Sequence, residues 1–164
     1  ALIAKNRAPG LDRSFAAQKW KNMDSKLWLD AADEAMDKEF HGNYDIWGGD
    51  IDPKAVELAR HNAELAGVED CIRFEVADAG KFHRDSEYGQ LVTNPPYGER
   101  LLEKKEAEEL YRVFGRALRD LPPKWRVVVL SSHTEFERCF GRPADKKRKL
   151  YNGMLKCDAF LYGK

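Results

Sequence analysis

From about residue 45 onward, short apolar runs alternate with amphipathic stretches, and this alternation limits the chain to few folds. Apolar runs predict strands at 46–49, 72–77, 91–93 and 127–130. Apolar residues at helical spacing predict one helix that begins at Pro53 and a longer one from about Ala107 to Leu121. Strands that alternate with helices build a mostly parallel sheet with helices on both faces. The predicted fold class is therefore α/β.

Capping and turn residues set the expected ends of these elements. Asp52 is placed to cap the helix that starts at Pro53, and Gly67 follows its last turn. The longer helix stops at Pro122-Pro123, because proline cannot continue a helix. In the tail, residues 150–161 suit an antiparallel strand pair that turns around Asn152-Gly153.

The first forty residues have a different character, with apolar positions that indicate helices and no strand. Those positions are Trp20, Leu27, Trp28, Ala31, Ala35 and Met36. Ala8-Pro9-Gly10 interrupts this segment early, so Leu2-Ile3-Ala4 is expected to be the last turn of a helix that begins further upstream. We therefore expect residues 1–44 to be a helical, truncated N-terminal part and residues 45–164 to be a Rossmann-like core.

Composition excludes several classes of function. The 164 residues contain 28 Lys+Arg and 28 Asp+Glu, so any contact with nucleic acid must come from local basic patches. The three cysteines and four histidines show neither a disulfide framework nor metal-ligand spacing, and we predict no metal site. No apolar run reaches the length of about 18 residues that suggests a membrane span, and no secretory leader is present. A soluble protein of the reducing cytoplasm, without a membrane partner, is expected.

The tetrapeptide Asn94-Pro95-Pro96-Tyr97 follows the predicted strand at 91–93 and combines an amide, a stiff turn and an aromatic ring. The two prolines fix φ and remove two backbone donors, which leaves a rigid set of acceptors. The Asn94 side-chain carbonyl suits an exocyclic N–H, and Tyr97 suits stacking on a nucleobase rotated out of its helix. The motif predicts a site for a flipped nucleobase amine, although a plain proline-rich turn has the same sequence pattern.

Acidic residues at the ends of two predicted strands provide a second group of candidates. In doubly wound sheets a ligand lies across the carboxyl ends of the strands. Asp50 at such an end suits the two ribose hydroxyls of a nucleoside cofactor, and Ile51 beside it suits the adenine face. Asp78, which is followed by the turn residue Ala79, suits the adenine amine. As simpler alternatives, Asp50 is a turn residue and Asp52 only a helix cap.

These motifs together resemble a known family. The segments that carry the resemblance are Gly49–Pro53, Ala59–Ala63, Ala77-Asp78, Asn94–Leu101, Arg7–Gly10 and Lys146–Gly153, and they extend over essentially the whole chain. They are similar to the class I S-adenosylmethionine-dependent methyltransferases linked to THUMP domains, above all to bacterial 23S rRNA guanine-N2 methyltransferases, often labelled N6-adenine-specific DNA methylases.

The resemblance implies roles for individual residues. It implies S-adenosylmethionine as cofactor, bound by Asp50, Ile51, Asp78, Ala79 and Asn94, and a catalytic turn formed by Asn94, Pro95, Pro96 and Tyr97. It implies 23S rRNA as the partner, with a THUMP domain upstream. Four residues are candidates for RNA contact. Tyr97 is expected to stack on the base, and the basic side chains of Arg100, Lys147 and Arg148 can neutralise phosphates. A basic run is also typical of an ordinary solvated surface.

Members of that family carry a first strand and a glycine-rich loop that this sequence lacks. In the family's order, the first strand lies between the strands that here end near Asp50 and Asn94. Without it, two ladders would stay unpaired, and buried backbone groups rarely lack partners. We therefore expect the missing strand to lie upstream in the native protein, and a complete sheet built from these residues alone would contradict this.

The expected mechanism follows from the amine. N–H groups of the exocyclic nitrogen would donate to the Asn94 side chain and the Pro95 carbonyl, which directs the nitrogen lone pair at the methyl sulfonium. Positioning supplies most of the acceleration. No general base is obvious. Glu99 is a candidate, but an ion pair with Arg100 is the better explanation of that residue, and water can accept the proton.

Other functions stay open at this point. The same turn serves adenine N6 in DNA or RNA. A nicotinamide-dependent oxidoreductase of similar topology is disfavoured because no G-x-G-x-x-G fingerprint is present. A non-catalytic RNA-binding fragment is the third alternative, because the glycine-rich loop is missing.

Overall fold

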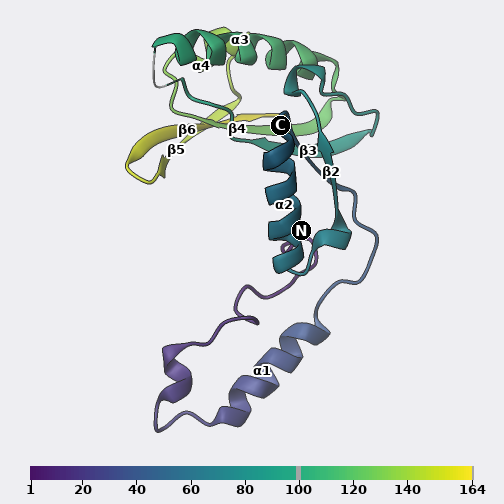
Figure 1. Cartoon of the computed structure of the whole chain (residues 1–164), viewed down its shortest axis with the longest axis vertical. Helices are drawn as coiled ribbons and strands as arrows, with labels where there is room; N and C mark the ends of the chain where they lie inside the picture. Colours follow the sequence, from purple (N-terminus) through teal and green to yellow (C-terminus); the bar gives the residue numbers. More distant parts are fainter. Residues whose placement is uncertain (99–100, 164) are drawn as a thin grey trace. The chain divides into compact units, whose positions relative to one another are not determined.

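The structure, a computed structural model, describes residues 1–98 and 101–163. It forms two compact units, Ala1–Val76 and Ala77–Lys164. Figure 1 shows the helices and strands of both units in the order of the sequence. The domain boundary expected between residues 44 and 45 stays a prediction. Among the described residues, no helix is both long and apolar enough to cross a membrane.

The first unit contains a βαβ element. Strands β1 (Ile46–Asp50) and β2 (Ile72–Val76) are parallel, with Ile46 opposite Ile72 and Asp50 opposite Val76. Helix α2 (Pro53–Leu65) and a short 3-10 helix (Glu69–Cys71) connect them. This confirms the predicted alternation of strand and helix in this part of the chain.

Helix α2 begins where the sequence predicts. Asp52 accepts a hydrogen bond from the backbone N–H of Lys54 at 2.9 Å, and Pro53 occupies the first turn, where its missing N–H is not needed. The helix buries Val56 and Ala63, and Gly67 follows it with a φ of 64°. The predicted cap, apolar face and stop of this helix are confirmed.

The opening residues adopt the geometry of a helix C-terminus. The N–H of Arg7 donates to the Leu2 carbonyl at 2.9 Å, and the N–H of Asn6 donates to the Ile3 carbonyl at 3.1 Å. Asn6 has a φ of 55°, so the two bonds form the pattern in which a left-handed residue ends a helix. This agrees with the prediction that Leu2-Ile3-Ala4 is a last helical turn.

The rest of the first unit is helical without a strand, as predicted, and loosely packed. It contains a short 3-10 helix (Ala16–Lys19) and α1 (Ser25–Asp37), neither of which has a buried residue. An ion pair of 2.9 Å between Arg7 and Glu39 joins its two ends.

The second unit is a four-stranded mixed sheet. It comprises a 3-10 helix (Ala79–Lys81), β3 (Tyr88–Thr93), α3 (Leu101–Ala117), a 3-10 helix (Leu118–Asp120), β4 (Lys124–Ser131), α4 (Phe136–Phe140), β5 (Lys146–Asn152) and β6 (Leu155–Tyr162). The strand order is β3-β4-β6-β5; β3 and β4 are parallel, and β6 runs antiparallel to both of its neighbours. The predicted closing antiparallel pair is confirmed, with Gly153 at a φ of 61° in its turn.

The core of the second unit lies between one face of this sheet and helices α3 and α4, which cover the same face (Figure 1). α3 contributes Ala107, Tyr111 and Phe114, and the sheet contributes Val127, Val129 and Phe160 among others. Phe136 and Phe140 of α4 stack with ring centroids 5.1 Å apart and fill the space between helix and sheet. Edge-on and offset aromatic contacts of this kind add to the burial energy.

Two findings go beyond the expected pattern of elements. α4 was not predicted, because its five residues are too few to show a helical period. The described strands also form two separate sheets, β1-β2 and β3-β4-β6-β5, rather than one. This agrees with the expectation that a strand between those ending at Asp50 and near Asn94 is missing from this chain.

Gly115 carries the contact between α3 and α4, and we predict that Gly115→Ala destabilises the fold. A Cβ at this position would lie 2.0 Å from the carbonyl oxygen of Phe140, a backbone atom that cannot move aside. Overpacking of this kind costs about 1–3 kcal/mol, so the melting temperature should fall by about 3–8 °C. Thermal unfolding monitored by circular dichroism measures this fall in the melting temperature. Arg116→Ala, on the exposed side of the same helix, is the control; equal melting temperatures for both variants would contradict the prediction.

Candidate functional site

The turn Asn94–Tyr97 follows directly after β3, whose last residue, Thr93, lies opposite Val129 on β4. The parallel pair β3-β4 therefore places the turn at the carboxyl edge of the sheet, where ligands bind in α/β folds. Gly98 ends the turn with a φ of 68°, and a Cβ there would lie 2.5 Å from the Cα of Lys104. Only glycine allows this close approach of the turn to α3.

Tyr97 forms a hydrogen-bonded chain with two asparagine side chains. Its hydroxyl donates to the Asn94 Oδ1 at 2.5 Å and accepts from the Asn152 Nδ2 at 3.5 Å. Burial raises the pKa of Tyr97, so the hydroxyl keeps its proton at neutral pH. The hydrogen bond from Tyr97 orients the Asn94 amide and occupies one of the two lone pairs of the Asn94 Oδ1. The other lone pair is left as an acceptor.

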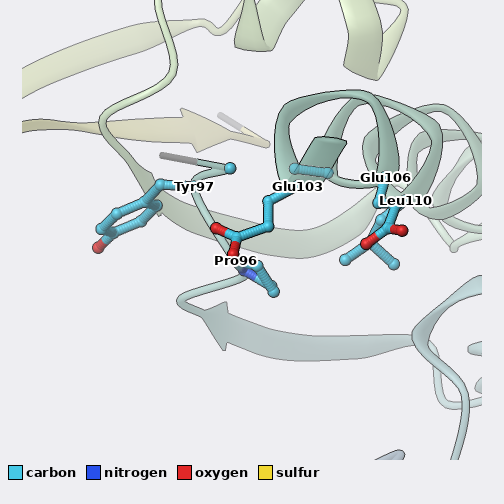
Figure 2. A pocket seen from close by; sticks show the side chains of 7 residues that line it. Pro96, Tyr97, Glu103, Glu106 and Leu110 are labelled. Atoms are coloured by element: carbon cyan, nitrogen blue, oxygen red, sulfur yellow. The ribbon is translucent and has the colours of Figure 1, made fainter. Parts of the chain in front are cut away.

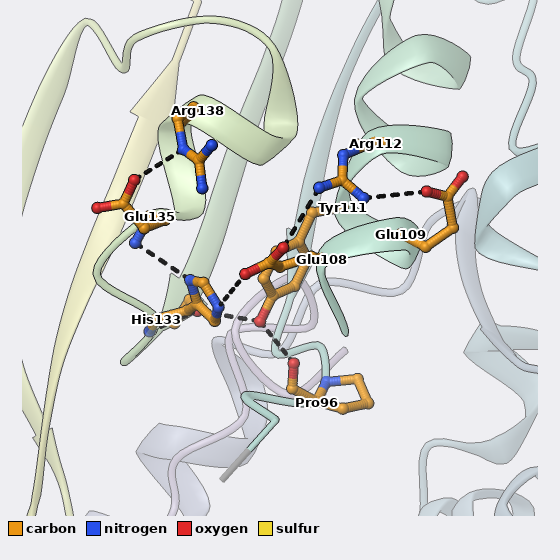
Figure 3. Close-up of polar contacts among 9 residues, drawn as sticks. Pro96, Glu108, Glu109, Tyr111, Arg112, His133, Glu135 and Arg138 are labelled. Atoms are coloured by element: carbon orange, nitrogen blue, oxygen red, sulfur yellow. Dashed lines mark hydrogen bonds and ion pairs between the residues drawn. The ribbon is translucent and has the colours of Figure 1, made fainter. Parts of the chain in front are cut away.

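A second tyrosine holds the turn from the core. The hydroxyl of Tyr111, on α3, donates to the carbonyl oxygen of Pro96 at 2.6 Å and lies 3.3 Å from the Ser131 Oγ (Figure 3). Tyr111 is fully buried, and burial raises the pKa of its hydroxyl, which stays protonated and can donate. The sequence pattern had marked this stretch of α3 only as a buried helix face, because a tyrosine at core spacing looks like any other aromatic.

His133, after the end of β4, lies beside Tyr111 with the ring planes 82° apart. Its Nδ1 accepts from the N–H of Glu135 at 3.1 Å, and its Nε2 lies 3.5 Å from a Glu108 oxygen (Figure 3). Desolvation lowers the pKa of His133, although Glu108 opposes this, so the ring is neutral at physiological pH. His133 is thus a buried residue of this unit.

A cavity of about 380 Å³ lies beside the turn (Figure 2). Its lining residues are Pro96, Tyr97, Gly98, Glu103, Glu106, Ala107 and Leu110. In Figure 2 the Glu103 carboxylate points from α3 toward Pro96, whereas the Tyr97 ring points away from both glutamates. Two carboxylates disfavour a phosphate and suit a group that donates hydrogen bonds. Neither glutamate was singled out from the sequence, since charged residues on a helix are ordinary.

Asp50 and Ile51 belong to the first unit. Asp50 ends β1 with an exposed carboxylate, one oxygen of which accepts from the N–H of Asp52 at 2.9 Å. Ile51 is 70% exposed and presents an apolar surface beside Asp50. Both features are compatible with a nucleoside that stacks on Ile51 and hydrogen-bonds to the remaining Asp50 oxygen.

Asp78 and Ala79 open the second unit, two and three residues after the end of β2. The half-buried Asp78 carboxylate caps a 3-10 turn by accepting from the N–H of Gly80 at 2.8 Å. Ala79 is exposed. The backbone hydrogen bond fixes the direction of the carboxylate, and its other oxygen stays available to an amine.

The two basic candidates on β5 have different surroundings. The Lys147 Nζ forms an ion pair of 2.7 Å with Glu137 and lies 5.8 Å from the centre of the Phe160 ring, so part of its charge is neutralised. Arg148 points to the opposite face of the strand and is exposed. Their role in RNA contact stays a prediction. Within residues 1–98 and 101–163, Arg148 forms no ion pair.

Two candidates, Glu99 and Arg100, lie outside the described residues. Within residues 1–98 and 101–163, no group of three or more His, Cys, Asp or Glu side chains is arranged to hold a metal ion. Cys71, Cys139 and Cys157 are buried and unpaired, and desolvation raises the pKa of Cys71 and Cys139, so these two thiols are protonated and unreactive.

Comparison with known families decides where the chain belongs. Residues 1–160 match the sequence profile of UPF0020, described as the RMKL-like methyltransferase domain. The chain belongs to this family. The expected α/β methyltransferase fold is thereby confirmed, and the chain contains part of an RMKL-like methyltransferase domain.

Named relatives of this RMKL-like domain are much longer proteins. "Putative RNA methyltransferase YpsC" of Bacillus subtilis (strain 168) is 43% identical over 166 residues, which cover 99% of this chain and 42% of that protein. "Ribosomal RNA large subunit methyltransferase K/L" of Shewanella baltica (strain OS185) is 39% identical over 167 residues, which cover 99% of this chain and 24% of that protein. The chain thus spans less than half of these relatives.

A solved structure has nearly the same fold. It is described as "Crystal structure of SMU.472, a putative methyltransferase complexed with SAH", with 41% sequence identity and a TM-score of 0.93. The match covers 99% of this chain and 44% of that one.

The ion pair between Lys147 and Glu137 leads to a pH-dependent prediction. The hydrogen bond from Lys147, followed by that from the Ala144 N–H, holds the pKa of Glu137 below its ordinary 4.5. The stabilisation is therefore complete above pH 4.5 and is lost as the pH falls through the lower folded-state pKa. The melting temperature of Glu137→Gln should fall below that of the wild type near neutral pH and approach it in acid.

Thermal unfolding between about pH 3 and pH 7 measures this difference for the two proteins. Glu57→Gln serves as the control, since Glu57 is an exposed α2 residue whose side chain forms no hydrogen bond or ion pair in the described structure. A difference that stays constant over the whole pH range would show that the carboxylate charge is not involved.

Proposed function

We propose that this chain is part of a methyltransferase domain that transfers a methyl group from S-adenosylmethionine to the exocyclic N2 amine of a guanine in ribosomal RNA. The observation that carries the proposal is the turn Asn94–Tyr97, which is rigid, lies at the carboxyl edge of the sheet and presents an oriented amide oxygen. Membership of the RMKL-like methyltransferase domain family and the rRNA methyltransferase name of a relative support it.

The turn's contribution is to hold the amine. An exocyclic nitrogen is a weak nucleophile because its lone pair delocalises into the ring. N–H donation to the Asn94 Oδ1 and the Pro95 carbonyl opposes this delocalisation and directs the lone pair at the methyl group. Such positioning of two reactants can supply about 7–11 kcal/mol of the barrier. When bound, S-adenosylmethionine supplies an electrophilic methyl group on a sulfonium.

The transfer balances without a metal or a protein base. A bond forms between the amine nitrogen and the methyl carbon as the bond from that carbon to sulfur breaks, and the sulfur keeps the electron pair. The excess proton on nitrogen then passes to water. Tyr97, whose pKa is raised, keeps its proton and does not serve as the base at neutral pH.

The candidate cofactor residues fit a nucleoside. Asp50 and Asp78 each use an oxygen in a local backbone hydrogen bond, which fixes the carboxylate, and Ile51 exposes an apolar face. We assign Asp50 to the ribose, Ile51 to an adenine face and Asp78 to the adenine amine, with Ala79 as a further cofactor-binding residue. The related protein crystallised with S-adenosylhomocysteine supports this choice of cofactor.

For RNA, we assign base stacking to Tyr97 and phosphate contact to Arg100, Lys147 and Arg148. All seven residues of β5 are exposed, so the basic strand is accessible to a polyanion. An upstream THUMP domain, 23S rRNA as the particular substrate and a cytoplasmic location remain predictions.

The cofactor assignment is tested by calorimetric titration of S-adenosylhomocysteine into the full-length protein, with NAD as the comparison ligand. We expect saturable binding of the first ligand alone. Asp50→Asn removes charge-assisted hydrogen bonds worth about 1.5–3 kcal/mol and should weaken binding about tenfold or more. Asp45→Asn, just before β1, is the matched control and should bind like the wild type. Binding of NAD instead would support an oxidoreductase, and binding of neither ligand would favour a non-catalytic RNA-binding role.

The target atom is tested by nucleoside analysis of rRNA incubated with the full-length protein and S-adenosylmethionine. We expect N2-methylguanosine, and we expect Asn94→Ala to lower its rate of formation at least about a hundredfold, since one positioned acceptor is lost. The appearance of N6-methyladenosine would replace guanine by adenine as the substrate, because the same turn suits either amine.

A further inference from the structure

Tyr111 places a hydroxyl deep in an aromatic core where phenylalanine would fill the same space. It lies in the cluster with Phe114, Phe136 and Phe140, and none of its surface is exposed. Burial of a hydroxyl is unfavourable unless it is hydrogen-bonded, and this one has two partners, the Pro96 carbonyl at 2.6 Å and the Ser131 Oγ at 3.3 Å. These two hydrogen bonds offset the burial of the hydroxyl, and one of them reaches the turn.

The direction of the hydrogen bonds follows from the donors available. The Pro96 carbonyl can only accept, so the single proton of Tyr111 goes to it. The Ser131 Oγ accepts from the His133 N–H at 3.1 Å and must then donate its own proton to Tyr111. The resulting row of hydrogen bonds leads from the end of β4 through Tyr111 on α3 to the turn. Successive hydrogen bonds of this kind strengthen one another.

The turn needs such a donor because it has few of its own. Pro95 and Pro96 lack N–H groups, so no backbone donor at these positions can fix the turn to its surroundings. A donor from elsewhere can instead hold the turn through a carbonyl, and Tyr111 does so at Pro96. Tyr111 is well suited, since its ring is packed edge-on against Phe136 at 4.9 Å and against His133 at 5.6 Å and cannot rotate freely.

We propose that Tyr111 is a positioning residue for methyl transfer, which fixes the Pro96 carbonyl and through it the acceptors of Asn94 and Pro95. The inference rests on the proposed function of the turn. Without the hydroxyl, the Pro95-Pro96 segment loses its link to α3, and the target amine is held less often in the geometry of attack. The rate of transfer depends on this geometry, whereas the cofactor contacts assigned to Asp50, Ile51 and Asp78 do not involve Tyr111.

Tyr111→Phe tests the proposal, because it keeps the ring and removes only the hydroxyl. The chain offers a matched control in Tyr162, which is 2% exposed, belongs to the same core and has a hydroxyl without a hydrogen-bond partner in the described structure. Both variants lose one buried hydroxyl, but only the first loses a bond to the turn. Ser131→Ala is a second test, since it removes the donor to Tyr111 and leaves the Tyr111 bond to Pro96.

Three quantities are measured for the full-length protein well below its melting temperature: the single-turnover rate of methyl transfer to rRNA, the Kd of S-adenosylhomocysteine and the melting temperature. For Tyr111→Phe we expect the rate to fall about tenfold or more, with a Kd within about twofold of the wild-type value. Tyr162→Phe should keep both values. Ser131→Ala should show a smaller loss of rate, and it decides the test if Tyr111→Phe does not fold.

A wild-type rate in Tyr111→Phe, with only a lower melting temperature, would overturn the inference and leave the proposed function intact. A proportional weakening of cofactor binding would likewise overturn it, since the effect would then be a general loss of structure. A wild-type protein that binds no S-adenosylhomocysteine and transfers no methyl group would instead refute the proposed function, together with the role of Tyr111.

Discussion

The absence of backbone N–H groups at Pro95 and Pro96 is the constraint on which the candidate site depends. A loop that cannot donate must be held through its carbonyls and side chains, and the second unit provides these contacts from three directions. Tyr111 donates from the core, Asn152 reaches Tyr97 from the β5-β6 hairpin, and Gly98 lets the chain pass close to α3. The two prolines make the turn stiff, and these contacts fix its position in the second unit.

The packing of the second unit supports these contacts with the turn. Tyr111 is immobile because Phe136 and His133 pack against its ring, and α4 is close to α3 because Gly115 has no side chain. The hairpin that carries Asn152 is tied to α4 by the ion pair between Lys147 and Glu137. Helix packing, the basic strand and the turn are therefore mechanically connected within one unit.

Sequence patterns predicted most of this fold, and the reasons are local. α2 has an acidic cap, a proline in its first turn and a glycine after its end, and each of these residues acts within one helical turn. α4 escaped prediction because five residues show no period. In the candidate site, Asn94–Tyr97 and the strand-end acids could be singled out from their residue types and their places after predicted strands, and the resemblance to a known family implies their roles. Tyr111, Ser131 and Asn152 could not, because their hydrogen bonds join residues far apart in the sequence. Tyr111 and Asn152 contact the turn across 15 and 55 residues, and Ser131 contacts Tyr111 across 20.

The separation of the described strands into two sheets has a practical consequence for the isolated chain. β3 is an edge strand, and its residues Tyr88–Thr93 contain no charged side chain and no proline. Tyr88 and Val92 on it are 73% and 76% exposed. Natural proteins protect free edges with lysine, proline or a covering segment, because an unprotected edge is a template for pairing with another chain. The free edge of β3 is therefore the part of this sheet on which another strand can pair, and added charge on β3 would oppose such pairing.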